Sequence, residues 1–68
     1  MRESTLLHAK SNIDAVGEDY GVKTWISLDG QLYVELSSGR SYELSENEIK
    51  YQAIEYLKSE ISYIENNF

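Results

Sequence analysis

Few side chains of this chain could perform catalytic or metal-binding chemistry. His8 is the single histidine and cysteine is absent, whereas a zinc site needs three or four such ligands. Gly-x-Ser-x-Gly motifs and glycine-rich phosphate loops are also absent from the sequence. We therefore expect His8 to be solvated, and we expect no catalytic residue, no metal ligand and no cofactor. A small three-stranded fold also leaves little room for a pocket, so we do not expect an enzyme.

Aromatic and acidic side chains are better candidates for function, because exposed aromatic rings are common anchors of protein–protein interfaces. The candidate partner-binding residues are Trp25, Tyr33, Glu43, Glu48, Tyr51 and Glu55. The 12 acidic side chains outnumber the 6 basic ones, which gives a formal net charge of −6. That balance opposes direct binding to nucleic acid, and it favours either a basic protein partner or solubility alone.

The composition fits one small domain, residues 1–68. With 68 residues and 41% hydrophobic content, the chain can build one modest core, and without cysteine it has no disulfide framework. No apolar run approaches the ~18 residues of a membrane span, and no signal-peptide pattern is present. We therefore expect no membrane association and a cytoplasmic location.

The first element that the spacing predicts is a helix from Ser4 to Val16. Its apolar side chains are spaced three, four and three residues apart, which places them on one face: Leu6, Ala9, Ile13 and Val16. Gly17 follows at the position where a left-handed C-cap is expected.

Residues 22–44 predict a three-stranded antiparallel meander whose register follows from its two loops. The loops, 28–30 and 37–39, are each three residues long and end in glycine, which suits the left-handed position of such a hairpin. This register pairs the residues of one apolar face: Ile26 with Leu32, Thr24 with Val34, Val22 with Leu36, Val34 with Tyr42, and Leu32 with Leu44. A shift of one residue would exchange the two faces, so the apolar pattern selects this register.

The same register places aromatic and charged side chains on the other face of the sheet. It places Trp25 opposite Tyr33, Lys23 opposite Glu35 as an ion pair, and Glu43 beside Tyr33. Two interpretations of the aromatic pair remain open. The rings either cover each other and protect the sheet, or they form a contact surface for a partner.

The last element is a helix that begins with Ser45-Glu46-Asn47-Glu48, a capping box in which Glu48 reaches back to Ser45. Its apolar side chains cover about half of the circumference: Ile49, Ala53, Ile54, Tyr56, Leu57, Ile61, Tyr63, Ile64 and Phe68. Glu48 and Glu55 share a line on the polar side, where Tyr51 is the aromatic residue. This acidic side either only solubilises the helix or meets a basic groove.

Together these elements predict an α+β fold in the order helix, three-stranded antiparallel meander, helix (α-β-β-β-α). Because only one sheet face is apolar, we expect both helices on that face. The layout resembles that of the double-stranded-RNA-binding domain over nearly the whole chain. The second helix of that family opens with a lysine-rich phosphate-binding segment, whereas this one opens with Ser45-Glu46-Asn47-Glu48, whose glutamates would repel phosphate.

Size, acidity and layout are similar to those of small phage-encoded inhibitors of bacterial defence, the anti-CRISPR proteins among them. That resemblance implies an inhibitor whose carboxylates occupy a basic nucleic-acid-binding surface of its target. The first hypothesis is accordingly a non-catalytic acidic protein-binding module, an inhibitor or adaptor, with a protein partner and no direct nucleic-acid ligand. The alternative is a self-assembling homodimer that uses the aromatic sheet face or a strand edge as its interface.

Overall fold

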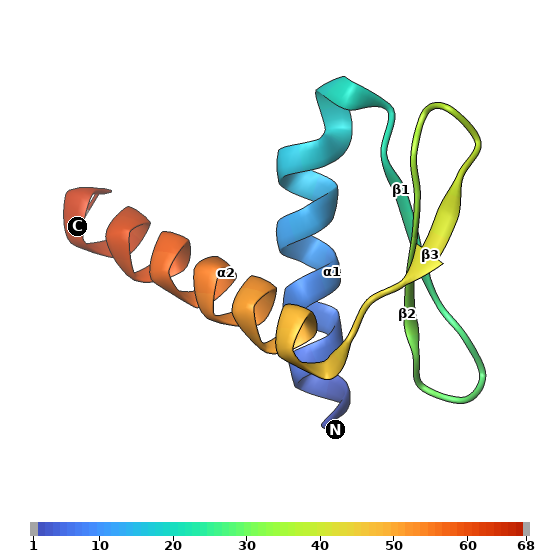
Figure 1. Ribbon diagram of the computed structural model, residues 1–68. Coiled ribbons are helices and arrows are strands. Elements are labelled where there is room, and N and C mark those ends of the chain that lie inside the picture. The colour runs from blue at the N-terminus through green and yellow to red at the C-terminus, as the bar shows by residue number, and fades with distance from the viewer. Residues whose placement is uncertain (1, 68) are drawn as a thin grey trace.

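The computed structural model describes residues 2–67, and it has the predicted order of elements (Figure 1). The elements are α1 (Glu3–Gly17), a 3-10 turn η1 (Glu18–Tyr20), β1 (Lys23–Ile26), β2 (Leu32–Glu35), β3 (Ser41–Glu43) and α2 (Glu46–Asn67). The strands form one antiparallel sheet in the order β1-β2-β3. The α-β-β-β-α prediction is thus confirmed; Phe68 lies outside the described residues.

The strand register is the predicted one. Trp25 pairs with Tyr33 and Ile26 with Leu32, while Tyr33 pairs with Glu43 across the second hairpin. Each hairpin closes through a loop of three residues whose glycine has a positive φ, 79° at Gly30 and 92° at Gly39. Glycine reaches this left-handed conformation without the steric cost that a Cβ would bring.

The end of α1 differs from the prediction, because Gly17 is not a left-handed cap. It has a right-handed φ of −91°, and the chain continues through η1 to Gly21, whose φ is 71°. Gly17 is instead required by close packing: a Cβ there would lie 2.7 Å from the Cβ of Val22. This contact depends on how the chain returns from α1 to β1, which helix spacing alone does not reveal.

The core lies between the sheet and the two helices, which are on the same side of it (Figure 1). Its buried side chains come from α1, from β2, from the residue after β3 and from the first two turns of α2: Leu6, Ala9, Leu32, Val34, Leu44, Ile49 and Ala53. α1 lies against β1, and α2 crosses α1.

The capping box at the start of α2 is confirmed, since the Glu48 backbone N–H donates to Ser45 Oγ and the Ser45 N–H donates to Glu48 Oε1.

Because the two helices cross, His8 does not lie where the sequence predicted. Its ring stacks on Tyr56 of α2, with 5.2 Å between ring centroids and 14° between the planes. Beside it, Asn12 Nδ2 donates to Gln52 Oε1 at 2.6 Å. The expectation of a solvated His8 is therefore wrong: the residue is half-buried and forms part of the α1–α2 contact.

The second half of α2 leaves the body of the protein (Figure 1). Only Ile49 and Ala53 of this helix are buried, and every residue from 57 to 67 is exposed. The apolar half-circumference predicted from the sequence therefore exists, but the core covers only its first part. We call residues 57–67 the arm.

Candidate binding surface

The outer face of the sheet carries a stacked aromatic pair, Trp25 on β1 and Tyr33 on β2. Their ring centroids are 5.6 Å apart and their planes differ by 8°. The Tyr33 hydroxyl donates to Gln31 Oε1 at 3.1 Å, which restrains the ring. Trp25 remains 41% exposed. The pair is therefore a restrained apolar surface, held on a rigid sheet, that a partner can contact with little loss of side-chain entropy.

Charged side chains flank this pair on two sides. Glu43 of β3 lies beside Tyr33 in the register, and Lys23 and Glu35 face each other at the next position. The ion pairs of residues 2–67 all lie within the helices: Lys10–Asp14, Lys50–Glu46 and Lys58–Glu55. The predicted ion pair between Lys23 and Glu35 is thus not formed, because solvated charges on an open sheet gain little from pairing. Trp25, Tyr33 and Glu43 together form what we call the aromatic face.

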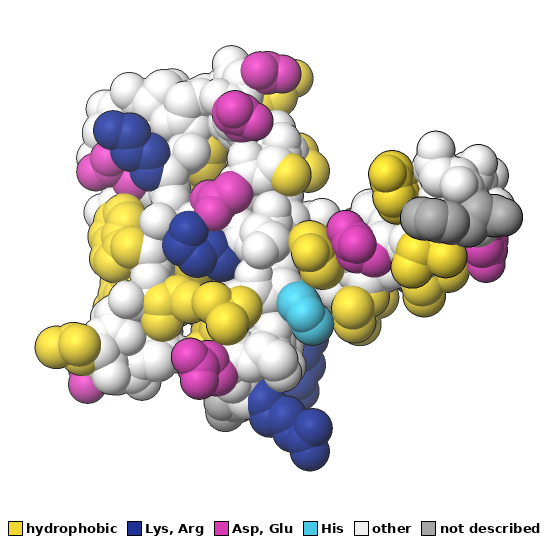
Figure 2. Space-filling model, turned by 180° about the vertical axis from the view of Figure 1, so that it is seen from behind, with side chains coloured by type: hydrophobic (Ala, Val, Ile, Leu, Met, Phe, Trp, Pro, Cys, Tyr) yellow, Lys and Arg dark blue, Asp and Glu magenta, His cyan; other side chains and the backbone are white. Residues whose placement is uncertain are grey.

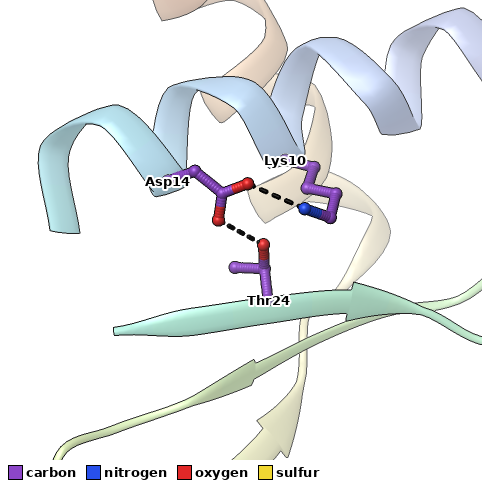
Figure 3. Close-up of polar contacts among 3 residues, drawn as sticks. All are labelled: Lys10, Asp14 and Thr24. Atoms are coloured by element: carbon purple, nitrogen blue, oxygen red, sulfur yellow. Dashed lines mark hydrogen bonds and ion pairs between the residues drawn. The ribbon is translucent and has the colours of Figure 1, made fainter. Parts of the chain in front are cut away.

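A polar cluster beneath β1 holds the strand that carries Trp25 (Figure 3). Lys10 Nζ donates to Asp14 Oδ2 at 2.8 Å, and Thr24 Oγ1 donates to Asp14 Oδ1. Because side chains alternate along a strand, Thr24 directed toward α1 places Trp25 on the outer side. Burial alone raises the pKa of Asp14, but the hydrogen bonds from Lys10 and Thr24 and the charge of Lys10 outweigh it and lower this pKa below 3.8.

The other predicted contact residues lie on α2. Glu48 is exposed and belongs to the capping box, Tyr51 is 61% exposed, and the Glu55 carboxylate is 3.7 Å from Lys58 Nζ. Because α2 is on the inner side of the sheet, these residues do not join the aromatic face. The structure thus brings three of the six predicted residues together and places the other three on a separate surface.

A groove that the sequence analysis did not predict lies between the end of α1 and the inner face of the sheet. It has a volume of about 320 Å³ and a largely apolar lining that includes Ile13, Val16, Val22, Leu36 and Tyr42. Val16, predicted to face the core, is 67% exposed here. The groove exists because α2 turns away after its second turn and leaves this part of the sheet uncovered. Glu48 and Gln52 are its polar side chains from α2.

The polar groups of the groove do not form a nucleophile–base pair, which covalent catalysis needs. Among residues 2–67, no group of three or more His, Cys, Asp or Glu side chains is placed to hold a metal ion. Neither helix in this part of the chain is long and apolar enough to cross a membrane.

Comparison with known proteins yields no match to this chain among protein-family models, curated proteins or solved structures.

Proposed function

We propose that this chain is a non-catalytic protein-binding module, an inhibitor or adaptor, that contacts a protein partner through the aromatic face. The observation that supports the proposal is the near-parallel stack of Trp25 and Tyr33 on an open sheet. Large, restrained aromatic rings with a charged rim are the typical composition of the energetic centre of an interface.

The charge of the molecule suggests the chemistry of the partner. With a formal net charge of −6, the chain would be attracted to a basic surface and repelled by a nucleic acid. In the narrower form of the proposal, the target is a cytoplasmic nucleic-acid-binding protein. The module then inhibits it by occupying its basic groove, as inhibitors of the anti-CRISPR type do.

The test is capture of the partner followed by measurement of its affinity. The tagged chain is incubated with nuclease-treated lysate of its source, the retained protein is identified by mass spectrometry, and binding is measured by calorimetry. We expect Trp25→Ala to weaken binding roughly tenfold or more, as truncation of an interface centre does. Leu28→Ala is the matched control, because Leu28 is an apolar side chain fully exposed at the tip of the first hairpin loop.

Two outcomes would contradict the proposal. Unchanged affinity of the Trp25→Ala variant would remove the aromatic face from the contact surface. A large fall in melting temperature for that variant would show instead that Trp25 serves to stabilise the sheet.

A second copy of the chain is the alternative occupant of the aromatic face. The observation in its favour is that β1 and β3 are both sheet edges and that β3 is exposed along its whole length. In that case the Trp25→Ala variant, or a substitution in β3, converts a dimer into a monomer, which light scattering at several concentrations detects.

A further inference from the structure

Apolar side chains remain uncovered in two places, on the arm (Figure 2) and on the inner face of the sheet beside β3. The backbone hydrogen bonds of the arm are made within α2, so the backbone there does not specify the form of an occupant. Beside β3, Leu36 and Tyr42 are 37% and 46% exposed and line the groove described above. Here the backbone does specify an occupant, because β3 is an edge of the sheet.

The register identifies the backbone groups of β3 that point away from the sheet. The Leu44 N–H donates to the Leu32 carbonyl oxygen of β2 at 2.9 Å. Because backbone groups alternate in direction along an antiparallel strand, those of Tyr42 also point toward β2, and those of Ser41 and Glu43 point outward. Since β3 is the last strand of the sheet, these outward groups have no strand partner among residues 2–67. β3 also contains neither lysine nor proline, which block pairing at many edge strands.

An extended segment added antiparallel to β3 would meet a different surface on each side of the sheet. Directly opposite residues of two such strands share a face, with their Cβ atoms about 4.5–5.5 Å apart. The residue opposite Tyr42 lies on the inner side, beside the apolar groove. The residue opposite Glu43 lies on the outer side, beside the exposed carboxylate. The surface therefore fits a segment in which apolar and basic side chains alternate.

The charge near this edge also favours a basic segment. Glu48 is the charged side chain that lines the groove, and no lysine or arginine of residues 2–67 lines it. Arg40, the basic residue nearest to β3 along the chain, precedes the strand. A second copy would bring its own net charge of −6 to the same edge, so charge complementarity favours a basic partner over a copy of this chain.

We propose that β3 binds an extended segment of a protein partner as a fourth, antiparallel strand, with apolar side chains toward the groove and basic side chains toward Glu43. Backbone hydrogen bonds to Ser41 and Glu43 hold the segment, and its alternating side chains provide selectivity. This site goes beyond the aromatic pair, because β2 and β3 separate the free edge from Trp25.

The probe is a blocked heptapeptide of alternating lysine and valine, acetyl-Lys-Val-Lys-Val-Lys-Val-Lys-amide, which is titrated into the isotope-labelled chain to about 1 mM. In the proposed register its lysine N–H groups face β3, while its valine side chains face the groove. We expect amide hydrogen exchange at Ser41 and Glu43, measured by NMR, to slow roughly tenfold or more. Exchange at Tyr42, whose N–H already faces β2, should change less.

Two N-methylated forms of the peptide are the matched controls, since they have the same charge and the same side chains. Methylation of the two central lysine nitrogens removes donors that face β3 and should abolish binding. Methylation of two valine nitrogens leaves those donors in place and should preserve binding. In the chain, Ser41→Pro removes an outward N–H and should weaken binding, whereas Ser41→Ala keeps this group and should not.

The proposal would be overturned if exchange at Ser41 and Glu43 did not slow at the highest peptide concentration. Equal binding of the two methylated peptides would also overturn it, as would loss of binding by the valine-methylated form alone. If both amides were already protected in a chain that sediments as a dimer, a second copy would be the occupant of the edge. The comparison of peptides does not depend on the folding of any variant, and it gives its result whether or not the aromatic face binds a partner.

Discussion

At the scale of single residues, Asp14 connects α1 to the strand that carries the aromatic face. It accepts hydrogen bonds from Lys10 and Thr24, which lower its pKa below 3.8. The folded chain therefore releases this proton more readily than the unfolded chain. Such a group stabilises the fold fully above the unfolded-state pKa, and the stabilisation is lost as the pH falls through the folded-state pKa.

We expect Asp14→Asn to lower the free energy of unfolding by about 0.5 kcal/mol at neutral pH, since the ion pair is partly solvated. For a domain of this size that equals a fall in melting temperature of about 2–4 °C. The difference should shrink as the pH falls below 3.8 and be lost once the pH has passed through the lowered pKa of folded Asp14, as measured by thermal melts across the acid range. Asp29→Asn, in an exposed turn, is the control for the change of charge. A difference that did not shrink at all as the pH fell through the acid range would show that the Asp14 carboxylate is not responsible.

The residues that sequence reasoning located are those whose position follows from local rules. Trp25, Tyr33 and Glu43 were assigned to one sheet face by the alternation of side chains and by the two glycine-ended loops, and the register confirms that assignment. His8 was misplaced because its surroundings are set by α2, which comes from the other end of the chain. The missing ion pair between Lys23 and Glu35 has a different cause, since register brings two side chains near each other without fixing their rotamers.

At the scale of elements, the junction between α1 and β1 depends on Gly17. The 2.7 Å approach that an added Cβ would make to Val22 leaves no space for a side chain, although the backbone of Gly17 is right-handed. In an ordinary helix interior, alanine in place of glycine stabilises by about 1 kcal/mol. Here we expect the opposite sign, because overpacking costs about 1–3 kcal/mol.

Thermal and urea unfolding of Gly17→Ala measure this effect, with an expected fall in melting temperature of about 5 °C or more. Val22→Gly removes the atom that the new Cβ would meet. In that background the cost of Gly17→Ala should largely disappear, and a double-mutant cycle reports the coupling. A stabilised Gly17→Ala variant would mean that the two elements separate easily at this point.

The order and register of the elements were predictable, whereas the path of α2 was not. The apolar half-circumference of α2 looks the same whether a core or a second molecule covers it, so amphipathicity alone does not tell which part of the helix the core covers. α2 has more apolar side chains than the rest of the protein can cover. The sheet and α1 offer surface for Ile49 and Ala53 but too little for the apolar residues of the later turns. The groove beside α1 has a related cause, because α2 leaves that part of the sheet uncovered.

At the scale of the whole molecule, the arm makes the protein elongated. Its radius of gyration is 12.6 Å, with extents of 39, 28 and 17 Å, whereas a compact domain of this length is expected near ~11 Å. The aromatic face and the arm belong to different elements, and the sheet separates the aromatic face from α2. A partner bound at the aromatic face therefore leaves the arm uncovered.

The two proposed interactions respond to salt in opposite directions, because each copy has a net charge of −6. Two acidic copies repel each other, so screening should strengthen their association. A basic partner is attracted, so screening should weaken its binding.

We expect the dimer dissociation constant to fall and the partner dissociation constant to rise as sodium chloride increases from about 0.05 to about 1 M. Over this range the screening length shortens from more than 10 Å to about 3 Å. Sedimentation of the chain alone and calorimetry with the captured partner measure the two trends separately. Dimerisation that weakens with salt would indicate a polar interface in place of an apolar one. Partner binding that is insensitive to salt would indicate that the aromatic rings act without help from the acidic charge.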